Sequence, residues 1–182
     1  MTHDDILSFW FTELSADEWF HGGEKVDQVI CERFTDAHRA VAAGECWEWR
    51  DTPAGVLAEV IALDQFSRNI YRGTPEAFAY DGQALVLAQV AVARGYDALV
   101  SETERPFLYL PYMHSESAVI HEEALRLFTA LGSEEHLKFE RIHKDIIDRF
   151  GRYPHRNDIL GRTSTPDEAA FLAETDYSFY AA

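Results

Sequence analysis

Signals that start and stop α-helices recur along the whole chain, and they constrain its fold more than any other feature. Thr-Pro pairs at positions 52, 74 and 165 place a capping residue before a proline, the favoured order at a helix start. Apolar residues with helical spacing often end at a glycine, the preferred residue just beyond a helix. Alternating apolar and polar residues, which predict strands, form no convincing run. The sequence therefore predicts an all-α fold with seven or more helices.

The expected helices follow from these starts, apolar stripes and stops. They cover residues 2–14, 24–43, 53–72, 84–94, 116–131, 134–150 and 165–172. Pro106 and Pro111 limit the segment after Ser101 to a turn or two, because an internal proline removes a backbone donor. The stretch Glu18–His21 leads into two glycines and is not expected to be helical. The favoured architecture is a set of antiparallel helical hairpins, packed side by side in one domain over residues 1–182.

The chain is strongly acidic, with a formal net charge of -16. Nucleic acids and anionic membrane surfaces both attract basic faces, so this charge argues against either partner. The longest apolar run, 84–93, is too short to span a bilayer, which takes about 20 residues. The first residues include Asp4 and Asp5, whereas a signal peptide begins with basic residues, so no secretion signal is expected. Cys31 and Cys46 lie beside apolar residues, so we expect buried free thiols in a soluble cytoplasmic protein.

Basic residues gather in one segment near the C-terminus. Positions 141–162 hold six basic and three acidic side chains, so this segment carries +3 while the rest of the chain carries -19. A helix C-terminus favours cations, which explains Arg149 and Arg152. It does not explain His155, Arg156 and Asn157, which directly follow a proline. Guanidinium groups bind carboxylates and phosphates in a bidentate manner, so the segment suits either anion capture or internal ion pairs.

A polar stripe interrupts the third expected helix. Asp64, Arg68 and Arg72 follow one another at spacings of four residues, so they lie along one face. Gln65 and Asn69 form a second pair with the same spacing beside them. One interpretation is a solvated face, whose exposed ion pairs each contribute only about 0.3–0.5 kcal/mol. The other is a polar pocket, because amides beside a charged stripe suit ligand recognition.

Further polar residues stand at the entrance of the helix expected over 116–131. His114, Ser115 and Glu116 are consecutive there, and helix capping explains the serine better than a catalytic triad does. Glu140 and His143 have the Glu-x-x-His spacing of di-iron bundles, but no second helical copy completes such a site. The sequence also has no paired-cysteine zinc motif and no calcium loop. We therefore expect neither a metal nor a cofactor.

Three long motifs occur in a fixed order along the chain. They are LDQFxRNIxRGT at Leu63–Thr74, FLYLPxxHSE at Phe107–Glu116, and a histidine, His143, followed by RFGRxPHRN at Arg149–Asn157. Together they resemble a bacterial family known as domain of unknown function 924. The opening Phe-Trp-Phe at positions 9–11 is also similar to the start of that family. The resemblance thus covers nearly the whole chain.

The resemblance implies an all-α array similar to tetratricopeptide-like helical repeats, and it carries no activity with it. It does transfer motif residues as candidates for a site. The candidates for catalysis are His114, His143 and His155. The candidates for ligand binding are Asp64, Gln65, Arg68, Asn69, Arg72, Glu116, Arg149, Arg152, Arg156 and Asn157.

Three functions agree with these residues. The first is a helical module whose polar pocket binds a small anionic molecule or a peptide carboxylate. The second is an enzyme in which a pocket histidine acts as general acid or base while arginines stabilise negative charge. The third is a protein-interaction scaffold with structural ion-pair networks. Under the first two, we expect 64–72 and 149–157 to meet at one pocket near His114 or His143, with at least one guanidinium left for an anion.

Overall fold

The computed structural model describes residues 1–174. Every regular element in that range is helical, which confirms the predicted all-α class. The α-helices are α1 (His3–Ser8), α2 (Ala16–His21), α3 (Gly23–Ala42), α4 (Pro53–Ile61), α5 (Ser67–Ile70), α6 (Asp81–Ala93), α7 (Arg105–Met113), α8 (Ala118–Leu131), α9 (Glu134–Phe150) and α10 (Pro166–Glu174). Two π-helical segments are η1 (Phe9–Glu13) and η3 (Ala62–Phe66). Short 3₁₀ segments are η2 (Trp47–Asp51), η4 (Pro75–Phe78), η5 (Tyr96–Ala98) and η6 (Pro154–Arg156).

Local capping explains where several helices begin. At α4, the Thr52 hydroxyl accepts a hydrogen bond from the Gly55 backbone N–H at 3.0 Å. At α10, Thr165 and Glu168 each bind the backbone N–H of the other. The prediction that Glu18–His21 is not helical is wrong, because this stretch lies in α2 behind a capping box that begins at Ser15. The two glycines that follow end α2 and start α3.

Helix α7 is longer than the predicted turn or two, since it runs for nine residues with Pro111 inside it. Proline removes one backbone hydrogen bond from a helix. Residues 106–113 are all buried, and α7 packs against α4, α6 and α8. Burial on several sides offsets the local cost of the proline.

The third predicted helix is interrupted by the wider turn of η3. It runs as α4, then η3, then α5. Such π-helical turns occur mostly as single turns inside α-helices, often at functional sites. Here Asp64 and Gln65 lie within η3 and are buried. The turn thus carries polar side chains into the interior of the molecule.

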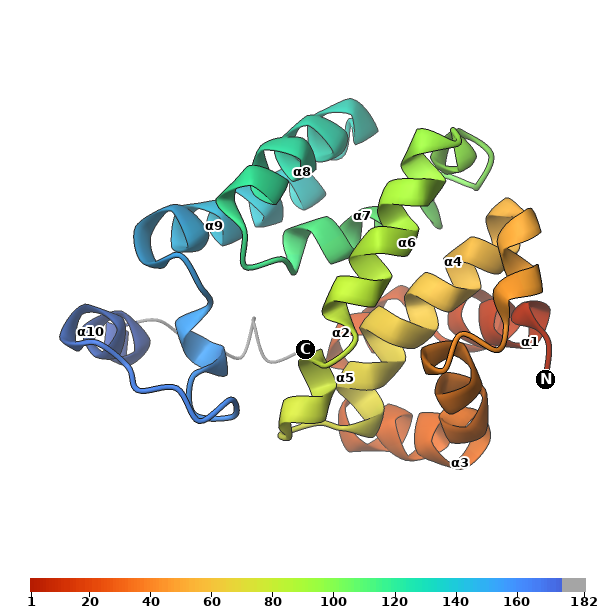
Figure 1. Cartoon of the computed structure of the whole chain (residues 1–182), viewed down its shortest axis with the longest axis horizontal. Helices are drawn as coiled ribbons and strands as arrows, with labels where there is room; N and C mark the ends of the chain where they lie inside the picture. The colour runs from red at the N-terminus through yellow and green to blue at the C-terminus, as the bar shows by residue number, and fades with distance from the viewer. Residues whose placement is uncertain (175–182) are drawn as a thin grey trace.

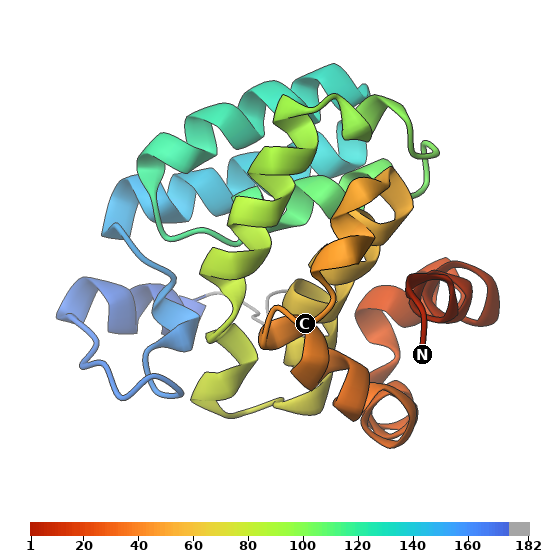
Figure 2. The same cartoon turned by 45° about the vertical axis from the view of Figure 1, so that its right-hand side comes forward.

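The helices surround one large apolar core. In the N-terminal half, α4 packs against α1 and α6, and α3 packs against α5 and η3 (Figure 1). Helix α7 joins this half to α8, and α9 lies along α8 (Figure 2). Trp10 and Phe66 are among the fully buried residues of this core. A smaller apolar cluster of Ile146, Ile147 and Tyr153 holds the segment that follows α9.

The two cysteines differ from their predicted surroundings. Cys31 is exposed and Cys46 is partly buried, so the expectation that both are core residues is wrong for Cys31. Both are free thiols, as predicted. Within residues 1–174, the helices lack the length and apolar character that crossing a membrane requires.

Candidate functional site

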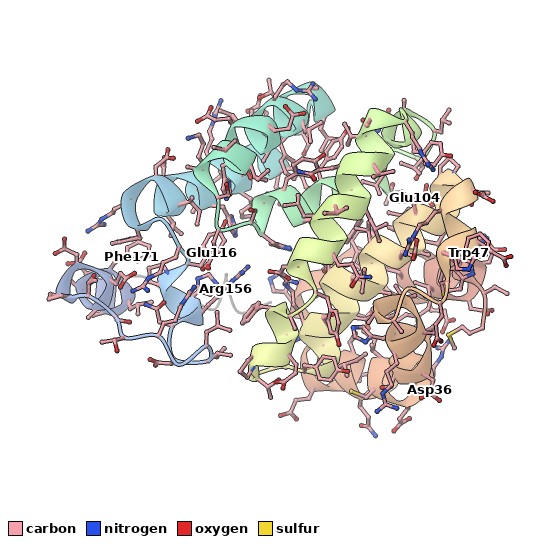
Figure 3. The ribbon with its side chains drawn as sticks, viewed as in Figure 1. Asp36, Trp47, Glu104, Glu116, Arg156 and Phe171 are labelled. Carbon is pink, nitrogen blue, oxygen red and sulfur yellow. The ribbon has the colours of Figure 1, made fainter. Side chains whose placement is uncertain are left out.

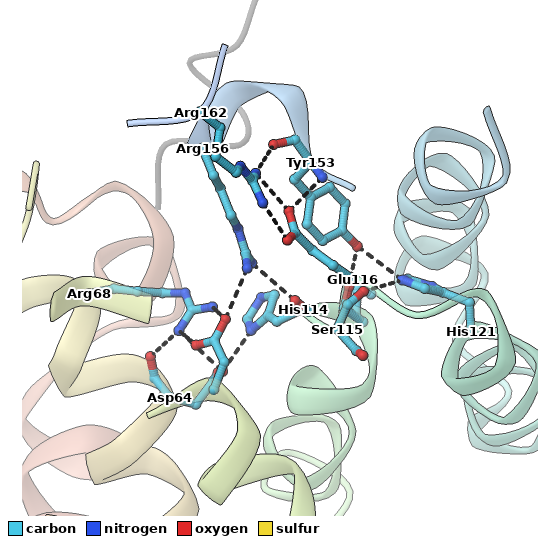
Figure 4. Close-up of polar contacts among 11 residues, drawn as sticks. Asp64, Arg68, His114, Ser115, Glu116, His121, Tyr153, Arg156 and Arg162 are labelled. Carbon is cyan, nitrogen blue, oxygen red and sulfur yellow. Dashed lines mark hydrogen bonds and ion pairs between the residues drawn. The ribbon is translucent and has the colours of Figure 1, made fainter. Parts of the chain in front are cut away.

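The polar stripe and the basic segment meet at Asp81, the first residue of α6. Arg68 donates from Nη1 and Nη2 to Asp81 Oδ1 and Oδ2, at 3.0 and 3.2 Å. Arg156 of η6 donates from Nη1 to Asp81 Oδ2 at 3.0 Å. Figure 4 shows Arg68 and Arg156 approaching the same place from opposite parts of the chain. The two segments that we expected to meet therefore do so.

Asp64 lies buried beside this pair and is only 1% exposed. Its Oδ1 is 3.2 Å from Arg68 Nη1 and 2.8 Å from His114 Nδ1. Gln65 Nε2 donates to Asp64 Oδ2 at 2.6 Å. Burial alone would raise the pKa of Asp64, but Arg68 and His114 outweigh it and hold this pKa below its ordinary value. Asp64 is therefore an ionised carboxylate at neutral pH.

His114, which follows α7, has two ring nitrogens in different surroundings. Because Asp64 is ionised and can only accept, His114 Nδ1 carries a proton and donates it at 2.8 Å. Burial lowers the pKa of His114 and the Asp64 charge opposes this only in part. The ring is thus neutral at pH 7, with its lone pair on Nε2. Within residues 1–174, no group makes a hydrogen bond to Nε2. The side chain of His114 is 16% exposed.

Arg156 is enclosed by aromatic rings. Its side chain is 7% exposed, and its guanidinium carbon lies 4.5 Å from the ring centre of Phe78 and 4.8 Å from that of Tyr153. Its Nη1 donates to Asp81, and its Nη2 donates to the His114 carbonyl at 3.1 Å. Arg156 Nε is buried and has no hydrogen-bond partner in the described part of the chain.

The positive charge of Arg156 is compensated less fully than that of Arg68. Arg68 lies against both Asp64 and Asp81, which raise its pKa although burial alone would lower it. Arg156 shares only Asp81, and burial lowers its pKa against the opposing effect of that carboxylate. A buried cation is costly unless it is fully paired, so the surroundings of Arg156 favour an additional anion.

The turn after α7 is fixed by side chains from other elements. The last carbonyls of a helix lack partners within the helix. Here three successive backbone carbonyls accept hydrogen bonds from side chains. The Met113 carbonyl accepts from Tyr153 Oη, the His114 carbonyl from Arg156 Nη2, and the Ser115 carbonyl from His121 Nε2. These contacts are drawn in Figure 4. They hold the backbone of His114 in place.

Glu116 completes the attachment of the basic segment to this turn. Arg162 donates to its two carboxylate oxygens at 2.6 and 2.9 Å, and the Tyr153 N–H donates at 2.7 Å. Burial would raise the pKa of Glu116, but these donors lower it. Asn157 Oδ1 in turn accepts from Arg162 Nε at 2.9 Å. Glu116 and Asn157 therefore hold Arg162 in place rather than offering free groups to a ligand.

Two of the predicted site residues point elsewhere. Asn69 Nδ2 donates to Asp27 of α3 at 2.8 Å, and Arg72 binds the same carboxylate at 2.6 and 2.9 Å. The expectation of one continuous stripe through Asp64, Arg68 and Arg72 is wrong at its third member. Arg72 follows the end of α5, where it ties α5 to α3 instead of joining the site.

Arg149 and Arg152 also lie outside the cluster around Asp81. Arg152 binds Glu168 through two hydrogen bonds of 2.6 and 2.8 Å. Arg149 stacks over the rings of Phe150 and Phe171, at 4.5 and 5.6 Å from their centres. Both arginines line a separate hollow between α9 and α10. The basic residues of this segment thus lie at several separate places in the structure instead of forming one site.

His143 and His155 flank the ring of Tyr153. Their ring centres lie 5.7 and 5.4 Å from that ring. His143 Nδ1 donates to the Phe139 carbonyl at 2.8 Å. Burial lowers the pKa of each histidine to about 3, so both rings are neutral at pH 7. Of the three candidate histidines, only His114 lines the cleft described next.

A cleft of about 360 Å³ opens onto the site. Its apolar walls come from Pro75, Phe78, Ala79, Leu85, Pro111 and Leu160, and its polar groups from Asp81, His114, Ser115, Glu116 and Arg156. Gly82 also lines it. Figure 3 shows Arg156 and Glu116 between the segment after α9 and the N-terminal helices. The volume and the apolar lining with a few convergent polar groups are typical of small-molecule sites.

Three important residues were missed by the sequence analysis. Asp81 lies before the helix expected over 84–94 although it is the first residue of α6, and Phe78 and Tyr153 were not singled out among many aromatics. Each becomes important only through contacts with distant parts of the chain. Residues 1–174 contain no group of three or more His, Cys, Asp or Glu side chains arranged to hold a metal ion.

Comparison with known proteins agrees with the resemblance seen in the sequence motifs. The chain is similar to a protein of unknown function, ATU0120, from Agrobacterium tumefaciens, with 40% identity and a TM-score of 0.91 over 95% of this chain and 97% of that one. No curated protein matches the chain. The profile of the bacterial proteins of unknown function DUF924 matches residues 6–176. The chain therefore belongs to the DUF924 family.

Proposed function

We propose that the cleft binds a small molecule through a carboxylate or a comparable anionic group, which lies against Arg156. The observation that carries this proposal is the shared carboxylate of Asp81, which serves both Arg68 and Arg156. Arg156 is thereby left as a buried cation with incomplete compensation, at the wall of an open cleft. An anion placed there would gain from low solvent screening.

The rest of the cleft defines the other part of the ligand. Phe78, Leu85 and Leu160 offer apolar surface, which suits a short hydrocarbon or aromatic body. The volume of about 360 Å³ limits the ligand to a small molecule or the end of a peptide. The net charge of -16 repels anions from the remaining surface, so Arg156 is the preferred place for them.

The wider setting of this site is also part of the proposal. We propose one domain of tetratricopeptide-like helical hairpins, acting in the cytoplasm. The packing of α8 along α9, with only Gly132 and Ser133 between them, supports a hairpin arrangement. The single large core that joins α1 to α8 supports one domain.

Gly82 provides a direct test of the cleft. It lies in the first turn of α6, and a Cβ atom added there meets no other atom within 4 Å. We expect Gly82→Phe to fold normally and to lose ligand binding, because the ring occupies the cleft. Benzoate is the first probe, and it should raise the Tm of the unsubstituted protein by about 3–6 °C at ten times its Kd. Isothermal titration calorimetry measures the Kd itself.

Two controls separate the cleft from general effects. Gly82→Ala adds only one methyl group and should keep benzoate binding, while gaining about 0.4–1 kcal/mol of stability. Benzamide has the shape of benzoate without its charge and should bind weakly. Equal stabilisation by benzamide, or unchanged benzoate binding in Gly82→Phe, would contradict the proposal. So would the absence of any response to benzoate, acetate and succinate.

A further inference from the structure

We infer that His114 is the general base of this cleft, with Asp64 as the residue that orients it. The inference rests on the proposed ligand site and adds an activity to it. The substrate class is a small carboxylate that also carries a hydroxyl group. Its anionic group lies at Arg156 and its hydroxyl at His114 Nε2.

The hydrogen bond to Asp64 determines which nitrogen of His114 can act. Asp64 Oδ1 also lies 3.2 Å from Arg68, so it is held by two partners and cannot rotate freely. His114 Nδ1 must therefore be the protonated nitrogen, and Nε2 keeps its lone pair. The ring lines the cleft, and the three clamped carbonyls of the turn fix its backbone. This is the arrangement that general-base catalysis requires of a histidine and its orienting carboxylate.

Charged and titratable groups face His114 from five elements. They are Asp64 of η3, Arg68 of α5, Asp81 of α6, His143 of α9 and Arg156 of η6. The carboxylates favour the imidazolium, whereas Arg68 and burial favour the neutral ring. The base is thus present in its active neutral form at pH 7. Once it is protonated, Asp64 lies within hydrogen-bonding distance and stabilises the new charge.

The proposed step is a single proton transfer. The O–H bond of the bound hydroxyl breaks, an N–H bond forms at His114 Nε2, and the electron pair stays on the ligand oxygen. The imidazolium is stabilised by Asp64, and the alkoxide lies near the cation of Arg156. Reversal returns the proton from Nε2 to the same ligand oxygen. No metal, oxidant or second reactant is needed for this step.

His114→Asn is the variant that isolates the base. The asparagine amide nitrogen occupies the place of Nδ1, so it keeps the hydrogen bond to Asp64 and removes Nε2. In ¹⁵N-histidine NMR at pH 7, we expect one resonance that disappears in His114→Asn and that has an unprotonated Nε2. A protonated Nε2 on His114 would overturn the inference, because such a ring donates from the cleft side instead of accepting.

Diethyl pyrocarbonate tests whether that nitrogen is accessible. This reagent acylates neutral imidazole nitrogens, and peptide mass spectrometry locates the modification. We expect modification of His114, with at least a tenfold slower rate when benzoate is bound. His21, whose side chain is 69% exposed, is the internal control. Full modification of His21 with none at His114 would contradict an accessible base.

The two proposals fail in different ways. If benzoate binds and Gly82→Phe abolishes binding while His114 Nε2 is protonated, the ligand site stands and the base does not. If Nε2 is unprotonated and reactive but benzoate gives neither stabilisation nor protection, the carboxylate site is wrong. Benzoate binding to His114→Asn with a Kd similar to that of the unsubstituted protein would show that the base is separate from the anion contact.

Discussion

Replacing Asp64 with alanine should lower the free energy of unfolding by about 3 kcal/mol, because a buried ionic partner of Arg68 is removed. The carboxylate also accepts hydrogen bonds from His114 and Gln65, and both would lose a buried partner. Arg68 would keep Asp81, which places the loss at the lower end of the range for broken buried pairs. Urea unfolding at pH 7, followed by circular dichroism, measures the change.

Glu123→Ala is the matched control for Asp64→Ala. Glu123 also binds an arginine, Arg126, through two short hydrogen bonds of 2.9 and 2.6 Å. Both side chains are exposed, at 41% and 60%. Exposed pairs contribute less than about 1 kcal/mol, so this variant should unfold almost as the unsubstituted protein does. Equal losses in the two variants would show that burial of Asp64 has no energetic consequence.

The sequence predicted the helices well because their ends are specified locally. The hydroxyls of Thr52 and Ser133 cap the helices that directly follow them, and no distant residue is needed. The same reasoning failed at α2, although Ser15 and Glu18 have the capping-box spacing. There the prediction rested on the two glycines after His21 alone and left out the cap at Ser15. Capping residues within four positions of a helix start were thus sufficient to predict where the helix begins.

The site was predictable only in part, because it depends on contacts between distant residues. The meeting of Arg68 and Arg156 followed from their chemistry, but their common partner Asp81 did not. The end of α5 is a second reason. Because this helix stops at Ile70, Arg72 lies against Asp27 although its spacing places it in line with Asp64. Helical periodicity alone does not reveal where the helix stops.

Lowering the pH from 6.5 to 5 should reduce the free energy of unfolding by about 3–4 kcal/mol. Burial lowers the pKa of His38 to about 4, and those of His143 and His155 to about 3. Unfolding releases these rings into water, where histidine has a pKa of about 6.5. Between these values the unfolded chain binds more protons than the folded protein. Stability is therefore fully present above pH 6.5 and is lost as the pH falls.

The magnitude follows from the number of histidines. Each histidine contributes up to about 1.4 kcal/mol per pH unit between its folded-state pKa and its unfolded-state pKa. His143 and His155 contribute less than this because they are partly exposed. Glu140 acts in the opposite direction, since burial raises its pKa and the folded protein holds its proton to higher pH. The expected loss of about 3–4 kcal/mol includes both reductions. Aspartate and glutamate groups with lowered pKa values add their effect only below about pH 4.5.

His38→Gln tests this explanation at a single position, because only one titrating ring is removed. Ser67 Oγ donates to the Leu63 carbonyl at 2.6 Å, so it accepts from His38 Nε2 at 2.8 Å. A glutamine amide can make the same donation and does not titrate. The slope of stability against pH should fall by up to about 1.4 kcal/mol per pH unit between pH 4.5 and 6.5. Parallel curves for His38→Gln and the unsubstituted protein would mean that His38 binds protons equally in the folded and unfolded states, which its bond to Ser67 and its packing against the rings of Tyr71 and Tyr80 oppose.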